Sequence, residues 1–178
     1  MTDAETAQLV LRCVVGVTMA AHGVKHARTL DGTAGWFGSI GFRRPRMQAV
    51  ASAVVEIGAG LALIAGLATP LAAAAVVGTM AVAALSVHVP NGFFITREGC
   101  EYVLNLGIAS VAIGVLGTGS ASVDGAFGLF SGVSGLQGAA LVAGLGLAGA
   151  AVQLAVFWRR PPTATGIVGE ETAEPAAP

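Results

Sequence analysis

MQAVASAVVEIGAGLALIAG (Met47–Gly66) is the stretch that decides the class of fold. It carries one charged residue, Glu56, in a run of otherwise mainly apolar and small side chains. A helix of about 20 residues, rising 1.5 Å per residue, crosses the roughly 30 Å hydrocarbon core of a bilayer. The run does not alternate between apolar and polar residues as a transmembrane barrel strand does. It therefore predicts a membrane-spanning helix.

Similar runs lie on both sides of this stretch. They predict four further spans, at Thr6–Lys25, Pro70–His88, Glu101–Leu116 and Gly135–Trp158. The expected fold is an all-α polytopic membrane protein. A four-helix transmembrane bundle would occupy residues 1–117, and residues 118–160 would add an extracytoplasmic loop and a fifth, C-terminal transmembrane helix. The tail over residues 161–178, rich in Pro, Thr, Ala and Glu, is expected to be disordered and cytoplasmic.

The overall composition agrees with a membrane protein and excludes other classes. Hydrophobic residues make up 54% of the chain and charged residues 11%, whereas soluble domains carry about 25% charged residues. The net charge of −1 gives no electrostatic case for binding nucleic acid. The chain opens with Asp3 and Glu5 rather than with basic residues, so the first apolar run is expected to remain as a span rather than act as a signal peptide.

The basic residues predict the orientation in the membrane. Eight of the nine fall in loops or helix ends that alternating spans place on one side: Lys25, Arg28, Arg43, Arg44, Arg46, Arg97, Arg159 and Arg160. The positive-inside rule assigns that side to the cytoplasm, with the N-terminus outside and the C-terminus inside. The ninth, Arg12, lies within the first span.

Charged groups inside the spans are few, and each is expected to have a partner, because an ionisable side chain at the bilayer centre costs about 2.5–3.5 kcal/mol on insertion scales. Helical rise places Arg12 and Glu56 at depths from which the long arginine side chain could reach the carboxylate. We therefore expect an Arg12–Glu56 ion pair, either as a purely architectural pair or as part of a site. Gly58, Ala62 and Gly66 recur every four residues, and the last span is dense in Gly and Ala, so both helices are expected to pack closely against neighbours.

The densest polar stretch is HVPNGFFITREGCEYVLN (His88–Asn105), which connects two apolar runs. The predicted topology puts His22, His88, Glu101 and Asn105 in one cytoplasmic layer, with Glu56 above them. We expect these groups to form one inward-facing polar pocket.

Several interpretations of this pocket are open. The histidines could be interfacial residues with only structural partners, or His88 could exchange protons with Glu101, because histidine titrates near neutral pH. Phe93 and Phe94 could anchor the chain at the membrane interface, or they could line a slot with Asn91 for a quinone or lipid head group. His22 and His26 have i, i+4 spacing, but no further ligand pattern accompanies them. No metal site is predicted, and haem is disfavoured.

Four motifs in order resemble the DoxX family of small bacterial membrane proteins. They are AHGVKH (Ala21–His26), DGTAGWFGSIGF (Asp31–Phe42), EIGAGLALIAGLATPLAA (Glu56–Ala73), and HVPNGFF (His88–Phe94) followed by EY (Glu101–Tyr102). The resemblance covers about Leu9 to Leu116, and the last span has no matching motif.

The resemblance implies a four-helix bundle in the bacterial cytoplasmic (inner) membrane. Some members look like subunits of thiosulfate:quinone oxidoreductases, and others are linked to redox or thiol stress. The motif positions are His22, Glu56, His88, Asn91 and Glu101. A lysine commonly follows the family's His-Gly by three residues. Here Lys25 follows Gly23 by two and His26 takes the third place, so either could inherit the role.

The sequence features are compatible with three functions. The first is a redox-linked membrane subunit that binds a quinone or another lipid-soluble electron carrier, with a quinone-linked oxidoreductase as the candidate assembly. His88 and Glu101 would exchange protons, and Asn91 and Asn105 would orient the head group. The second is a non-enzymatic anchor that assembles soluble redox or stress enzymes. The third is a carrier for a small solute or lipid, with the Arg12–Glu56 pair as a midplane gate. The expected partners are the bilayer and either further copies of the chain or other membrane or redox subunits.

Overall fold

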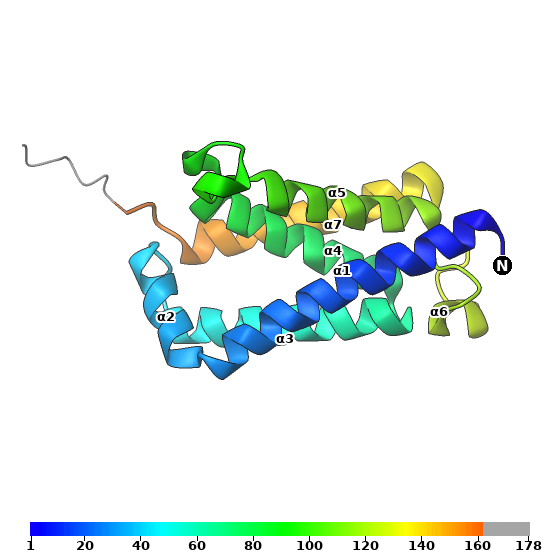
Figure 1. Cartoon of the computed structure of the whole chain (residues 1–178), viewed down its shortest axis with the longest axis horizontal. Helices are drawn as coiled ribbons and strands as arrows, with labels where there is room; N and C mark the ends of the chain where they lie inside the picture. The colour runs from blue at the N-terminus through cyan, green and yellow to red at the C-terminus, as the bar shows by residue number, and fades with distance from the viewer. Residues whose placement is uncertain (162–178) are drawn as a thin grey trace, which may run out of the picture.

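The structure is a computed structural model that describes residues 1–161, and it is helical throughout (Figure 1). Its helices are α1 (Asp3–Arg28), α2 (Leu30–Ser39), α3 (Pro45–Ala65), α4 (Thr69–Ala83), α5 (Glu101–Leu116), α6 (Val123–Ala126) and α7 (Gly135–Phe157). Among the described residues the one β feature is an isolated bridge between Phe42 and Trp158. The predicted disordered tail begins at the last described residue and otherwise lies outside this range.

Local sequence signals explain where the helices begin and end. Thr2 and Glu5 form a reciprocal capping box at the start of α1. Pro45 opens α3, and Gly66 ends it in the left-handed conformation that glycine adopts without strain. Pro70 lies in the first turn of α4, as expected. The five predicted long helices are therefore all present as helices, and the bounds of α5 agree with the prediction.

Four helical segments are long and apolar enough to cross a membrane: Asp3–Arg28, Pro45–Ala65, Thr69–Asn91 and Gly135–Phe157. The fifth apolar helix, α5, has 16 residues and is shorter than that length. The chain is thus a multi-pass membrane protein with at least four candidate spans. A crossing by all five helices stays a prediction.

Close backbone contacts hold the helices in two groups. Helix α1 packs along α3, and α4 packs against α5 and α7. A Cβ atom on Gly16 of α1 would lie 2.6 Å from the carbonyl oxygen of Gly60 on α3, and one on Gly146 of α7 would lie 2.6 Å from the carbonyl oxygen of Ala74 on α4. Small residues permit this approach in lipid. The expected close packing of the last helix is therefore present.

The glycine repeat predicted for α3 is only partly correct. Gly58 faces open space, with nothing within 4 Å of a Cβ built on it. Gly60, two residues further along α3, makes the close contact with α1 instead. The four-residue spacing identified the right helix but the wrong face, because spacing alone does not show which side of a helix meets its neighbour.

One end of the molecule collects the basic segments. Helix α2 lies there beside the last turn of α7 and the start of α3 (Figure 1). The amide of Arg43 donates to the carbonyl of Phe157 at 2.7 Å, and the amide of Arg159 donates to the carbonyl of Gly41 at 3.0 Å. These two hydrogen bonds join the segment after α2 to the end of α7. We call this end of the molecule, where the basic residues gather, the cationic end. Helix α6 and the N-terminus lie at the opposite end.

The contact between α1 and α3 predicts a strong position effect within α3. Gly60→Leu should force the two backbones apart and destabilise the fold by about 1–3 kcal/mol, as overpacking does. Gly58→Leu, two residues away in the same helix, should change stability little because its Cβ meets open space. Thermal unfolding in detergent would measure both. Equal effects of the two variants would contradict the packing described here.

Candidate functional site

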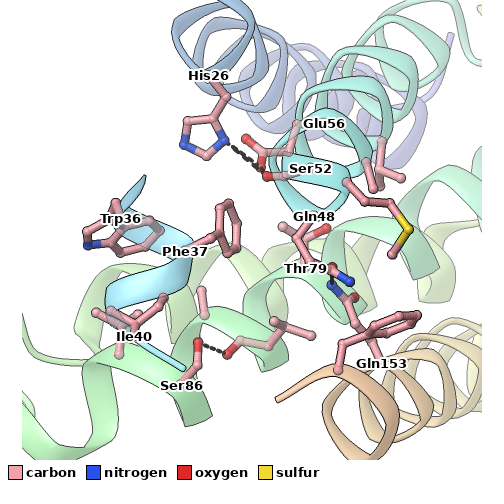
Figure 2. Close-up of a pocket in the computed structure, with 17 residues that line it drawn as sticks. His26, Trp36, Phe37, Ile40, Gln48, Ser52, Glu56, Thr79, Ser86 and Gln153 are labelled. Atoms are coloured by element: carbon pink, nitrogen blue, oxygen red, sulfur yellow. Dashed lines mark hydrogen bonds and ion pairs between the residues drawn. The ribbon is translucent and has the colours of Figure 1, made fainter. Parts of the chain in front are cut away.

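A cavity of about 350 Å³ lies between α3, α4 and α7, and α2 covers one end of it (Figure 2). Most of its wall is apolar or aromatic, including Trp36, Phe37 and Phe157. Polar side chains enter it from α1, α3 and α7. An apolar cavity with a few convergent polar groups is the usual form of a small-molecule site.

A histidine, a serine and a glutamate meet at one side of this cavity. The Nδ1 atom of His26 lies 3.0 Å from Oγ of Ser52 and 3.3 Å from Oε1 of Glu56. The Ser52 hydroxyl donates a short hydrogen bond to the same carboxylate oxygen. Glu56 is 4% exposed, whereas the His26 side chain is 23% exposed. The carboxylate is therefore buried with two partners, one of which still reaches the surface.

The packing of α1 on α3 brings these residues together. Ser52 and Glu56 are one turn apart on α3 and so share a face. A Cβ on Gly23 of α1 would lie 2.8 Å from Ile57 and 2.9 Å from the carbonyl oxygen of Ala53. Since only glycine allows this approach, the turn that follows Gly23 carries His26 to the carboxylate.

A second polar contact crosses the cavity between α3 and α7. The amide of Gln153 donates to the side-chain oxygen of Gln48 at 2.9 Å. The hydroxyl of Thr79 on α4 and that of Ser86, in the helical turn that follows α4, instead donate to backbone carbonyls four residues earlier, at 2.9 and 2.7 Å. The available hydrogen-bonding groups of the cavity are thus the His26–Ser52–Glu56 cluster and the glutamine pair.

Of the residues predicted for the site, His26 and Glu56 meet in the cavity, and His88 and Glu101 do not. Nδ1 of His88 lies 2.6 Å from the carbonyl oxygen of Glu98, and Glu101 accepts a hydrogen bond from the amide of Ile95 at 3.1 Å. Both partners belong to the connection between α4 and α5. The predicted single polar pocket is therefore not formed.

The end of α4 gives the physical reason. The helical path continues past Ala83 through a π-helical turn (Ala84–His88) and a 3-10 turn (Val89–Asn91). The short connection that follows leaves backbone groups that need partners, and the nearby polar side chains supply them. Asn91 likewise donates to the carbonyl of Val87 at 3.2 Å.

Other predicted site residues lie outside the main cavity. Lys25 and Asn105 are exposed, and His22, also exposed, stacks on Tyr102 with ring centroids 5.9 Å apart. Of the two candidates after the His-Gly motif, His26 rather than Lys25 enters the cavity.

A separate hollow of about 370 Å³ matches the predicted aromatic slot. Its lining residues are Asn91, Gly92, Phe93, Phe94, Thr96 and Arg97. All of them are exposed and come from a single connecting segment. This hollow holds no acid–histidine pair, so the cavity between the helices is the stronger candidate site.

The predicted Arg12–Glu56 ion pair is not formed. Arg12 is fully buried, and its two terminal nitrogens donate to the carbonyls of Ala121 and Thr118 at 2.6 and 3.3 Å. The Gly16–Gly60 contact sets Glu56 level with Ala20, about 12 Å along the helix axis from Arg12. The carrier hypothesis used this pair as its gate and therefore loses its basis.

The loop whose carbonyls accept hydrogen bonds from Arg12 also caps the N-terminal end of α4. Asp124 is fully buried and accepts hydrogen bonds from the amides of Ala68 and Thr69 at 2.8 and 2.7 Å. Its carboxylate supplies acceptors that the first amides of a helix otherwise lack. Gln8 donates to the carbonyls of Gly117 and Thr118 nearby, at 2.8 and 3.0 Å. Arg12, Gln8 and Asp124 are thus structural.

The sequence contained a signal for part of the site that was missed. Gln48, Ser52 and Glu56 follow at i, i+4 and i+8 in an apolar helix, and they form one polar stripe facing the cavity. Gln153 gave no such signal, because a lone glutamine in α7 can face any direction. Within residues 1–161 no three His, Cys, Asp or Glu side chains are placed to hold a metal ion.

The fold and the cavity together define a multi-pass helical membrane protein with a largely apolar intramembrane site. Residues 7–89 match the model of the DoxX family, which confirms the resemblance seen in the sequence. The matched region runs from α1 to the helical turns that follow α4. Searches of curated proteins and of solved structures gave no match.

The placement of Arg12 predicts how two substitutions combine. Arg12→Met should destabilise the protein because it leaves buried carbonyls unpaired. Combined with Glu56→Gln, its effect should be additive within about 0.5 kcal/mol, since the two side chains share no contact. His26→Gln combined with Glu56→Gln is the matched control, for which coupling is expected. Unfolding measurements that gave a coupling above about 1 kcal/mol for Arg12 and Glu56 would restore the ion pair.

Proposed function

We propose that this protein is a redox-linked membrane subunit that binds the head group of a quinone in the cavity between α3, α4 and α7. The observation that carries the proposal is the buried Glu56 carboxylate, which accepts a hydrogen bond from Ser52 and lies 3.3 Å from Nδ1 of His26 in an otherwise apolar and aromatic cavity. His26 and Glu56 take the proton-exchanging roles that the sequence suggested for His88 and Glu101.

The chemistry of quinone reduction fits these groups. Reduction of a quinone to the hydroquinone takes up two electrons and two protons, and the protons end on the two carbonyl oxygens. In this proposal a partner oxidoreductase supplies the electrons. The His26–Ser52–Glu56 cluster hydrogen-bonds one carbonyl of the head group and passes protons to it. Trp36 and Phe37 give flat apolar surface for the ring.

The different exposures of His26 and Glu56 support a direction for the protons. Glu56 is buried, and His26 lies in the last turn of α1, near the cationic end, with part of its ring at the surface. A proton from water would reach His26 first and then the carboxyl group. Histidine suits this relay because it gains and loses protons near neutral pH.

The proposal includes the topology predicted from the sequence. All five long helices cross the bacterial cytoplasmic membrane, with the N-terminus outside and the C-terminus inside. The gathering of Lys and Arg at the α2 end supports this orientation. With only 16 residues, α5 would cross where the protein thins the bilayer or buries the helix ends.

Quinone binding can be tested on the purified protein. Quinones quench tryptophan fluorescence, and Trp36 lines the cavity. Saturable quenching by a ubiquinone analogue is therefore expected. Glu56→Gln and His26→Gln should each weaken binding roughly tenfold, the scale of one charge-assisted hydrogen bond. His88→Gln, outside the cavity, is the matched control and should bind as the wild type does. Absence of saturable binding by the wild-type protein would refute the proposal.

The anchor hypothesis has one observation in its favour. Arg43 and Arg44 are exposed on the segment between α2 and α3, and Arg46 is exposed in the first turn of α3. The 3.6 Å contact between Arg46 and Asp31 is solvent-exposed and worth little energy. A basic surface at the membrane boundary suits an acidic soluble partner.

The anchor hypothesis makes a prediction distinct from that of quinone binding. Replacement of Arg43, Arg44 and Arg46 by Ala should reduce the amount of soluble redox enzyme that co-purifies with the membrane protein, and more salt should reduce it in the wild type too. Quinone quenching should not change. Retained co-purification in the triple variant would exclude these arginines as the docking surface.

A further inference from the structure

We infer that the ligand is a quinone with a long hydrocarbon tail, and that the tail lies in a lateral groove between α3 and α7 that opens to the lipid. This inference rests on the proposed function, because it starts from a head group in the cavity beside Glu56. It adds the part of the ligand that the groove would recognise.

A second cavity of about 290 Å³ adjoins the head-group cavity. Val55, Thr79 and Gln153 line both of them, so the two spaces lie side by side with only these side chains between them. From Thr79 the groove follows α4 to Leu71, a distance of about 12 Å by helical rise. The polar groups that the head needs are all at one end of this combined space.

The packing of the helices explains why a groove exists here. Helix α7 approaches α4 closely at Gly78 and Gly146, where a Cβ on Gly78 would lie 3.1 Å from the Gly146 carbonyl oxygen. Helices α3 and α7 do not pack along each other, and the Gln48–Gln153 hydrogen bond joins them beside the two cavities. Ala75 on the floor and Gly149 on the wall leave space that larger side chains would fill.

The mouth of the groove faces the hydrocarbon region. Val55, Leu71 and Leu145 border it and are 42%, 47% and 47% exposed. They belong to α3, α4 and α7, all of which are candidate spans. A tailed ligand could therefore move sideways from the bilayer into the site without passing its chain through water.

Charge decides between the lipids that could occupy such a groove. The head-group end holds the buried carboxyl group of Glu56, with no Lys or Arg among the residues that line the cavity. A phospholipid would bring an anionic phosphate to that carboxyl group, at the cost of like-charge repulsion in a low dielectric. A quinone head is neutral and offers carbonyl oxygens. The groove is therefore assigned to the tail of the quinone.

Two glycines in α7 allow a matched test. Neither Gly149 nor Gly144 has any atom within 4 Å of a built Cβ, so both accept a larger side chain. Gly149 lines the groove and Gly144 does not. Fluorescence quenching of the full chain in detergent would compare ubiquinone carrying a decyl tail with the same head group lacking a tail, for Gly149→Leu, Gly144→Leu and the wild type.

The wild type should bind the tailed quinone roughly tenfold more tightly than the tail-less one. Gly149→Leu should remove most of that difference and leave the tail-less quinone unaffected, and Gly144→Leu should behave as the wild type. Equal binding of both quinones, or a tail preference that survives Gly149→Leu, would overturn the groove and leave the head-group site standing. Release of a co-purified phospholipid by Gly149→Leu, with quinone binding unchanged, would assign the groove to phospholipid and also overturn the inference. Failure of both quinones to bind would overturn the proposed function itself.

Discussion

The backbone contact between α1 and α3 is the constraint on which the site depends. Gly16, Gly23 and Gly60 lack the Cβ atoms that would hold the two helices apart. In lipid, where apolar side chains gain little by leaving the solvent, close van der Waals packing is a main source of helix association. The same contact fixes the axial register. His26 therefore meets Glu56, and Arg12 falls about two turns beyond that carboxylate, beside the loop after α5.

Each buried charge within residues 1–161 has local partners where it lies, although Nε of Arg12 has none. Arg12 reaches backbone carbonyls, Asp124 accepts the first amides of α4, and Glu56 accepts from Ser52 beside His26. The cost of an unpaired charge in lipid does not require the charges to gather. It requires only that each finds a local partner, and loop backbones supply partners at the helix ends. Only Glu56, near the middle of α3, depends on side chains alone, which distinguishes it from the structural charges.

Composition and length were enough to predict the helices. The contacts between helices were not predicted, because they depend on the rotation of each helix about its axis and on the axial register between neighbours. Apolar runs, Pro45, Gly66 and Pro70 identified the long helices and most of their ends. The site needed two further quantities, the face of α3 that meets α1 and the axial offset between them. The polar stripe through Ser52 indicated the face of α3, but nothing in the sequence indicated the axial offset between α1 and α3. The prediction therefore paired Glu56 with Arg12, whereas the structure places His26 beside that carboxylate.

The cavity combines parts of the chain with different relations to the family. His26, Ser52 and Glu56 lie within the region that matches the DoxX model, and so does the α2 cover. Gln153 and Phe157 come from α7, which lies beyond that region and forms the remaining wall. The acid–histidine pair thus lies in the region that matches the family model, whereas the shape of the cavity beside it depends on α7. Since α7 also borders the groove, changes in α7 can alter which molecules reach Glu56 without altering the groups that would react with them.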